Sequence, residues 1–298
     1  MTGTAPPDAI RIVQVSDTHL SRNRAYFQTN WESFLDLVGA LRPDLVVHSG
    51  DLCLAGNEDA DDIAFGREQM ARLPVPWRII PGNHDIGDTP PDEKRGHALT
   101  AERRSHWLQH FGPDWWEERL GGWRIIGVNA QLMGSGLESE EEQWQWLAGT
   151  LARDGGGPVL LFSHKAPFFS DPDDPGFTNS ALRPAPRARL LELMRAADVR
   201  WFACGHNHVY QTARHDGTRY VWAPSTSFVH RLPKPGAKRS ARRITGFVHY
   251  RLNGTRLTYE CIEPPEFMRY DVTAWQRANG TTSRLPPMPL GALGGRQA

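Results

Sequence analysis

Short apolar runs alternate with amphipathic segments over the first two thirds of the chain. Ile10–Ser16 (IRIVQVS) and Asp44–Ser49 (DLVVHS) predict strands, and apolar residues recur at helical spacing from Trp31 to Leu41. That helix is expected to begin near Asn30, because asparagine favours the N-cap. Similar patterns predict helices over Glu58–Leu73, Thr100–Phe111, Glu140–Arg153 and Pro186–Ala196, and strands over Trp77–Ile80, Trp123–Asn129, Pro158–Ser163 and Arg200–Ala203.

The pattern becomes β-rich after residue 203. Asp216-Gly217 and Asn253-Gly254 are strong hairpin signals, and Ser139 and Glu142 are spaced as a capping box for the helix that follows. The predicted strands of this part are Val209–Ala213, Tyr220–Ala223, Ile244–Leu252 and Arg256–Ile262. Alternating strands and helices with an antiparallel finish predict one mixed α/β domain with packed sheets.

The ends of the chain lack this periodicity. Residues 1–9 are expected to form an N-terminal tail, residues 10–262 one domain, and residues 263–298 a C-terminal extension. The stretch Arg284–Ala298 is rich in proline and glycine. We expect it to lie extended over the surface or to be partly disordered.

Composition narrows the classes of function. Lys and Arg number 34, as do Asp and Glu, so there is no basic field for nucleic acid and no such partner is expected. No window approaches the roughly 20 apolar residues of a membrane span, and residues 1–9 lack a signal-peptide pattern. Three widely spaced cysteines, Cys53, Cys204 and Cys261, suit a reducing compartment. These features predict a cytoplasmic protein without a membrane partner.

Five polar motifs each follow a predicted strand. They are Asp17-Thr18-His19, Gly50-Asp51, Gly82-Asn83-His84-Asp85, Ser163-His164 and Gly205-His206-Asn207-His208. Because ligand crevices of open α/β sheets lie at the carboxyl ends of strands, these motifs should meet at one rim. Singly they are weak: Asp-x-His is often a surface turn, and a lone histidine such as His164 is often a core residue.

The residue types favour metal binding. Carboxylate oxygen and imidazole nitrogen suit Mn, Fe, Zn, Ni or Co, and no thiolate is offered. A metal pair needs a ligand that touches both ions, and Asp51, next to the sterically free Gly50, is the candidate. His206 and His208 would face opposite sides of a regular strand. Both can bind only if the segment bends, which Gly205 permits.

The five motifs in this order resemble the calcineurin-like metallophosphoesterase superfamily, most closely its bacterial cyclic-nucleotide phosphodiesterase (class III) group. The resemblance covers about residues 10–262 and implies a four-layer α/β/β/α sandwich of two mixed sheets flanked by helices. It implies that one ion is held by Asp17, His19, the bridging Asp51 and His208, and a second by Asp51, Asn83, His164 and His206. It also implies that the metals are divalent or trivalent. Their identity, among Fe, Mn, Zn and Ni, stays open.

The resemblance also implies an activity. The chain is expected to hydrolyse a small-molecule phosphodiester, with 3′,5′-cyclic nucleotides among the candidates, by attack of a metal-bridging hydroxide on phosphorus. His84 would face the substrate phosphate instead of binding metal, and Asp85 is a candidate to orient it. The alternatives are a phosphomonoesterase or another phosphorylated-metabolite hydrolase. A catalytically silent scaffold is disfavoured because every ligand position is filled.

One position departs from the family pattern. The fourth motif of the cyclic-nucleotide group often reads His-His-Pro, whereas here Lys165 follows His164. Lys165 is interpreted as a solvated loop lysine, with contact to a second anionic group as the alternative. His48 is expected to be a core histidine. Residues 224–230 form either a substrate loop or a plain connection, and the basic stretch Lys234–Arg243 a solvated loop or a lid.

Overall fold

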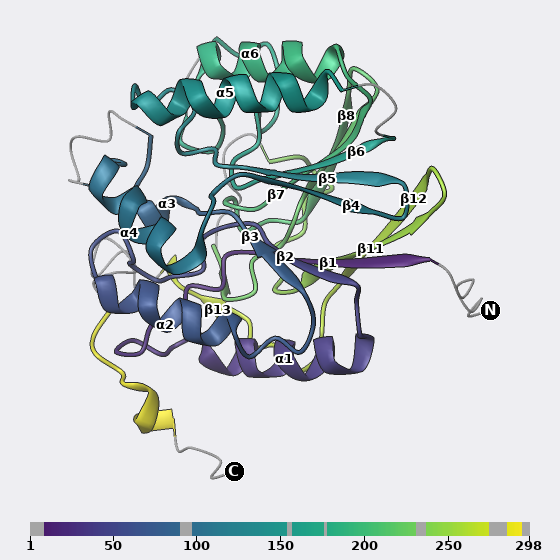
Figure 1. The fold of residues 1–298 in the computed structure, drawn as a ribbon. Helices are drawn as coiled ribbons and strands as arrows, with labels where there is room; N and C mark the ends of the chain where they lie inside the picture. Colours follow the sequence, from purple (N-terminus) through teal and green to yellow (C-terminus); the bar gives the residue numbers. More distant parts are fainter. Residues whose placement is uncertain are drawn as a thin grey trace.

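Two stacked β-sheets form the centre of the molecule (Figure 1). The computed structural model describes residues 9–89, 97–153, 157–175, 178–230, 237–273 and 285–293. The first sheet has the spatial order β12 (Arg256–Ile262), β11 (Phe247–Asn253), β1 (Ile10–Val15), β2 (Leu45–His48) and β3 (Trp77–Ile79). The second has the order β4 (Trp116–Leu120), β5 (Trp123–Val128), β6 (Val159–Ser163), β7 (Val199–Cys204), β9 (Thr218–Trp222) and β8 (Gln211–His215).

Helices cover the outer face of each sheet. The longer helices are α1 (Gln28–Leu41), α2 (Ala60–Met70), α4 (Ala101–Phe111), α5 (Glu138–Leu151) and α6 (Pro184–Arg195), and α3 is the single turn Asn83–Ile86. Helices α1 and α2 pack on the first sheet and α5 and α6 on the second (Figure 1). Side chains such as Val47 and Phe162 fill the space between the sheets. The predicted four-layer α/β/β/α sandwich of two mixed sheets is therefore confirmed.

The parallel strands bring the polar motifs to one edge. Strands β1, β2 and β3 are mutually parallel, as are β5, β6, β7 and β9. The Gln14 amide joins the two sheets near this edge, because its Nε2 donates to Ser49 Oγ (2.9 Å) and to Cys204 O (3.2 Å). The carboxyl ends of β1, β2 and β7 thus lie together. Every motif from the sequence follows a strand that ends here.

Two local predictions are wrong. Helix α1 begins at Gln28, and Asn30 lies inside it, donating to Thr226 O (2.7 Å). Helix α5 has no capping box, because Leu137 is its N-cap, and Glu140 accepts from Gly134 N (2.6 Å) instead. The hairpin predicted at Asn253-Gly254 is present between β11 and β12, where Asn253 pairs with Arg256 at the end of the strands. The Asp216-Gly217 turn between β8 and β9 is confirmed.

Described parts of the C-terminal extension pack near the motif edge. Strand β13 (Tyr270–Asp271) pairs in parallel with β10 (Phe228–Val229). Farther along, Leu285 is buried in the same cluster as Phe27 and Phe228, before the 3₁₀ turn Leu290–Leu293. The predicted N-terminal tail up to residue 8 and most of residues 274–298 lie outside the described part. Among the described helices, none has the length and apolar character needed to cross a membrane.

The buried carboxyl group of Asp62 should make stability depend on pH. Burial raises its pKa to about 6, against 3.8 for the free side chain. Between these values the folded protein holds a proton that the unfolded chain has lost, so the free energy of unfolding falls as pH rises, by roughly 3 kcal/mol. We expect Asp62→Asn to remove this loss. Urea unfolding at pH 4.5 and 7.5 measures it; equal pH dependence in both proteins would contradict the prediction.

Candidate metal centre

The structure brings the predicted ligands together. Three groups of side chains place their ligand atoms within 4.8 Å of one another: Asp17, His19 and His208; His19, Asp51 and His84; and Asp51, His164 and His206. Asn83 joins the third group, because its Oδ1 lies 3.3 Å from His164 Nε2. The histidines and aspartates of these groups are buried, except for the half-buried His84. All seven predicted metal ligands therefore surround one buried point at the strand ends.

Acceptor atoms face each other in the first group. His19 Nε2 lies 3.3 Å from His208 Nε2, which in turn lies 3.3 Å from Asp17 Oδ1. His208 Nδ1 donates to Phe228 O (3.0 Å), which leaves the lone pair of His208 on Nε2. When His208 is neutral, its Nε2 and Asp17 Oδ1 are two acceptors with no proton between them. A cation at this point would satisfy both of these atoms and could also be bound by His19 Nε2.

The third group has similar outer contacts. His164 Nδ1 donates to Ser49 O (2.9 Å), so its Nε2 faces Asp51 Oδ2 at 3.3 Å. His206 is fixed from outside, because its Nε2 bonds to Asn179 O (2.5 Å). Asp51 Oδ2 also lies 3.9 Å from His19 Nε2. That oxygen therefore stands between the two groups, where a bridging ligand belongs.

The electrostatics of the cluster favour a cation. Burial opposes ionisation of Asp51, yet His164 and His84 hold the pKa of its carboxyl well below the usual range. Burial likewise opposes ionisation of Asp17, but His208 lowers its pKa to about 2. In the other direction, burial would lower the pKa of His164, and Asp51 raises it to about 9. The negative field that draws a proton to His164 would equally favour a metal ion.

The backbone is bent to aim these side chains. Among the described residues, seven other than glycine have a positive φ, and five of them belong to the cluster: Asp17 (54°), His19 (49°), Asp51 (54°), His206 (66°) and His208 (52°). Such conformations cost on the order of 1 kcal/mol or more each, and they concentrate at functional sites. Strain gathered at these five residues indicates that the fold is shaped to make them converge.

The role predicted for Gly205 is corrected. The bend that turns both histidines inward lies at His206 and His208 themselves, and Gly205 has no positive φ. Gly205 is needed for space, since a Cβ there would stand 1.9 Å from Ser16 Oγ and 2.5 Å from Asp17 Oδ2.

Gly205→Ala should therefore displace Asp17. We expect metal binding to weaken at least tenfold and the free energy of unfolding to fall by about 1–3 kcal/mol, as in other overpacked sites. Metal titration and urea unfolding measure the two effects. Gly149→Ala, where a Cβ meets nothing within 4 Å, is the control. Unchanged metal affinity in Gly205→Ala would show that the close approach is unimportant.

His84 lies at the mouth of the cluster, and its orienting partner is not the predicted one. Its Nδ1 bonds to Leu54 O (2.7 Å), and its ring stands edge-on to His19 with centroids 4.6 Å apart. The Asp85 carboxylate instead accepts from the backbone N–H groups of Gly82 (2.7 Å) and Cys53 (2.8 Å). Asp85 thus ties the second and third motifs together, and the prediction that it orients His84 is wrong.

The interpretation of Lys165 as a solvated lysine is also wrong. Its side chain is only 2% exposed, and its ammonium pairs with Asp88 and donates to Asn179 Oδ1 (3.0 Å). The alternative, contact with a second anionic group, stays a prediction. The nearest anion is Asp88 of this chain. No pattern in the sequence predicted that Asp88 would lie near the site.

Residues 224–230 do reach the site, as a support beneath it. Ser225 Oγ and Ser227 Oγ both donate to Asp17 O, at 2.9 and 2.6 Å. The Phe228 ring packs on His208 with centroids 4.2 Å apart. The expected core position of His48 is confirmed, and Thr18 Oγ1 bonds to its Nε2 (3.0 Å). Serines in a strand connection carry no specific signal, so the sequence could not single them out.

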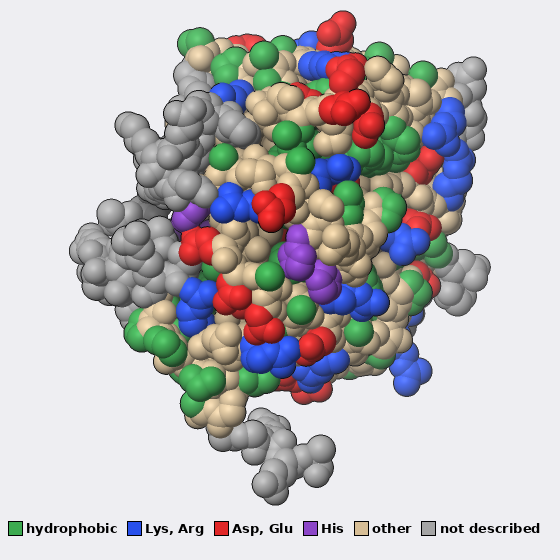
Figure 2. Space-filling model, turned by 60° about the vertical axis from the view of Figure 1, so that its left-hand side comes forward, with side chains coloured by type: hydrophobic (Ala, Val, Ile, Leu, Met, Phe, Trp, Pro, Cys, Tyr) green, Lys and Arg blue, Asp and Glu red, His purple; other side chains and the backbone are tan. Residues whose placement is uncertain are grey.

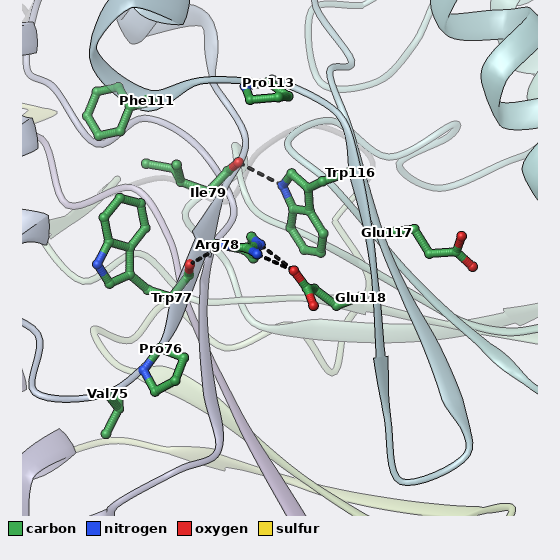
Figure 3. A pocket seen from close by; sticks show the side chains of 10 residues that line it. All are labelled: Val75, Pro76, Trp77, Arg78, Ile79, Phe111, Pro113, Trp116, Glu117 and Glu118. Atoms are coloured by element: carbon green, nitrogen blue, oxygen red, sulfur yellow. Dashed lines mark hydrogen bonds and ion pairs between the residues drawn. The ribbon is translucent and has the colours of Figure 1, made fainter.

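Two hollows are lined by residues other than the predicted ligands. One, of about 560 Å³, is lined by the edge strands β3 and β4, where Trp116 Nε1 donates to Ile79 O (2.9 Å) and Arg78 Nε to Glu118 Oε1 (2.6 Å) (Figure 3). The other, of about 680 Å³, is lined by residues of α4 and by Asn57, whose N–H donates to His84 O (3.0 Å). The face shown in Figure 2 carries basic and acidic side chains interspersed, in line with the net charge of zero.

Phosphodiesterases and a phosphatase are among the known proteins that this chain resembles. A probable glycerophosphodiester phosphodiesterase of Arcobacter nitrofigilis is 27% identical over 67% of this chain and 72% of its own. A probable cyclic nucleotide phosphodiesterase of Rhodococcus erythropolis is 26% identical over 74% of this chain and 72% of its own. The fold matches a purple acid phosphatase from yellow lupin with a TM-score of 0.66 at 16% identity, over 88% of this chain and 53% of that one.

The family model of the calcineurin-like phosphoesterases matches residues 10–210. The matched segment holds all five motifs and the strands that present them. Members of this family are metal-dependent phosphoester hydrolases that bind two metal ions. This chain belongs to the calcineurin-like phosphoesterase family.

Proposed function

We propose that this protein hydrolyses a small-molecule phosphodiester, with 3′,5′-cyclic nucleotides among the candidate substrates, at the buried cluster of Asp17, His19, Asp51, Asn83, His164, His206 and His208. The observation that carries the proposal is the position of Asp51 Oδ2, 3.3 Å from His164 Nε2 and 3.9 Å from His19 Nε2. One carboxylate oxygen between two ligand groups is the arrangement that a metal pair requires.

The chain offers two ligand sets. The first is Asp17, His19, Asp51 and His208, and the second is Asp51, Asn83, His164 and His206. Two bound cations supply positive charge for the phosphate oxygens and acidify water at neutral pH. The nitrogen and oxygen donors suit Mn, Fe, Zn or Ni. Thiolate ligation is disfavoured, because burial raises the pKa of Cys53 and of Cys204 well above the usual range.

His84 acts on the substrate side in this proposal. Its bond to Leu54 O fixes the ring and turns Nε2 toward the cluster. When the imidazole is protonated on both nitrogens, Nε2 can donate a proton to a phosphate oxygen or to the leaving alkoxide. Unlike the buried imidazoles around it, the ring is partly exposed, as a group that meets substrate must be.

The names of the relatives favour a diester over a monoester. Both bacterial relatives described above are named as phosphodiesterases. A phosphomonoesterase stays the alternative.

A substrate screen tests the proposal. Metal-free protein would be reconstituted with Mn, Fe, Ni or Zn and given bis-p-nitrophenyl phosphate and p-nitrophenyl phosphate. We expect kcat/KM for the diester to exceed that for the monoester at least tenfold with one or more metals. A reversed ratio would favour the phosphomonoesterase. Absence of turnover on both compounds and on cyclic nucleotides with every metal would refute the proposal.

A further inference from the structure

A buried ion pair lies directly behind the second ligand set. Lys165 and Asp88 are 2% and 3% exposed, and they contact each other. Asn179 completes the group, because its Nδ2 donates to Asp88 Oδ2 (2.6 Å) while its Oδ1 accepts from Lys165 Nζ (3.0 Å). We call these three residues the Lys165 cluster. Lysine and aspartate are almost never fully buried unless they are paired, so each depends on the other two.

The Lys165 cluster is connected to every ligand that belongs to the second set alone. Lys165 follows His164 in the chain. The backbone oxygen of Asn179 accepts from His206 Nε2 (2.5 Å), which leaves Nδ1 as the ligand atom of that ring. The Gln131 amide, with its nitrogen toward Asp88 Oδ1 (3.3 Å), accepts from Asn83 N with its oxygen (2.7 Å). Three separate segments are thereby held at fixed positions by one ion pair.

The first set has different supports. His208 is held by Phe228 O, and Asp17 by Ser225 and Ser227. Among the described residues, these contacts include no member of the Lys165 cluster. The side-chain supports of the two sets are therefore separate, although the sets share Asp51 and the His206 backbone N–H donates to Asp17 Oδ2 (3.0 Å).

A buried ion pair usually adds little to the free energy of unfolding. The cost of removing both charges from water offsets most of their attraction, and apolar residues of the same volume often stabilise a protein as well or better. What such a pair supplies is fixed geometry, since each charge accepts only a few positions of its partner. Contacts behind metal ligands commonly set metal affinity in this way.

We propose that the Lys165 cluster is a positioning device that sets the affinity of the second metal site without affecting the first. The inference rests on the proposed function, because it presupposes the two ligand sets. Lys165 touches neither substrate nor reacting atoms here; it acts through His164, Asn83 and His206. The two sites should therefore differ in how they respond to the same substitution.

The test is a titration of the metal-free protein with Mn²⁺, monitored by calorimetry and by electron paramagnetic resonance. The variants are Lys165→Met and Asn179→Ala. Asn179 is exposed, so its truncation removes the side-chain hydrogen bonds to Lys165 and Asp88 with little risk to folding. The matched control is Arg124→Met, which breaks a buried ion pair with Glu117 (Arg124 Nε to Glu117 Oε1, 2.6 Å) on β5, away from the ligands.

We expect the wild type and Arg124→Met to bind two Mn²⁺ ions. In both cluster variants the second Kd should rise by about 10–100-fold while the first changes less than about threefold. The signal of a coupled Mn²⁺ pair should then need excess metal, and kcat should recover at saturating Mn²⁺. Equal weakening of both sites, or the same weakening in Arg124→Met, would overturn the inference by showing general destabilisation.

Failure of the inference and failure of the proposed function give different results. If the wild type and both cluster variants bind two ions with unchanged affinity, the Lys165 cluster has no positioning role and the proposed function stands. If the wild type itself binds fewer than two ions, the proposed function fails, and the inference with it. The metal titration alone distinguishes these two results, without any measurement of turnover.

Discussion

Asp51→Asn should abolish both metal binding and turnover. Its Oδ2 stands between the two ligand groups, and His84 N donates to its Oδ1 (2.7 Å), a bond that asparagine can keep. The substitution thus removes the shared negative charge with little change of shape. We expect bound metal to fall below one ion per chain and kcat/KM to fall by roughly 10³-fold or more, because both cations depend on this carboxylate. Elemental analysis and steady-state kinetics measure the two losses.

The control is Asp36→Asn, which removes the same charge from an exposed position on α1. It should leave both quantities unchanged. If Asp51→Asn kept two ions per chain, Asp51 would not be the bridging ligand. If it lost only one, the remaining ion would be held without Asp51, and the shared role would be wrong.

His84→Ala should separate metal binding from catalysis. We expect two ions per chain to remain and kcat to fall by about 10²–10⁴-fold, the usual contribution of a positioned proton donor. His110→Ala makes the same substitution on α4, outside the ligand groups, and should have little effect. Metal content and kcat, measured on the same preparations, give both answers.

The geometry makes this experiment informative in both directions. His84 lies within ligand distance of His19 and Asp51, so proximity does not decide between a ligand and a substrate-side group. Loss of an ion in His84→Ala would assign it to the metal site. Unchanged turnover would remove it from the mechanism.

Most of the fold could be predicted from local patterns. Apolar residues at helical spacing placed Trp31, Phe34 and Val38 on the buried face of α1. Element ends were less predictable, because they depend on contacts that local sequence does not contain. Asn30 looks like a cap, but it lies where it can reach Thr226 O, 196 residues away.

The ligands of the candidate site could be predicted, whereas their supports could not. Asp17, His19 and His208 are chemically distinctive and follow strands, so order and residue type sufficed. Asp88, Gln131 and Asn179 are ordinary polar residues in connections, and only tertiary structure brings them behind the ligands. Lys165 was misread for the same reason, since a loop lysine is usually solvated and its buried partner lies 77 residues away.

The most direct test of the central claim is the anomalous diffraction of crystals grown with Mn²⁺. Two peaks are expected, one among Asp17, His19, Asp51 and His208, and the other among Asp51, Asn83, His164 and His206, with the Asp51 carboxylate between them. A single peak, or a pair that does not share Asp51, would contradict the claim that these side chains form a two-metal centre.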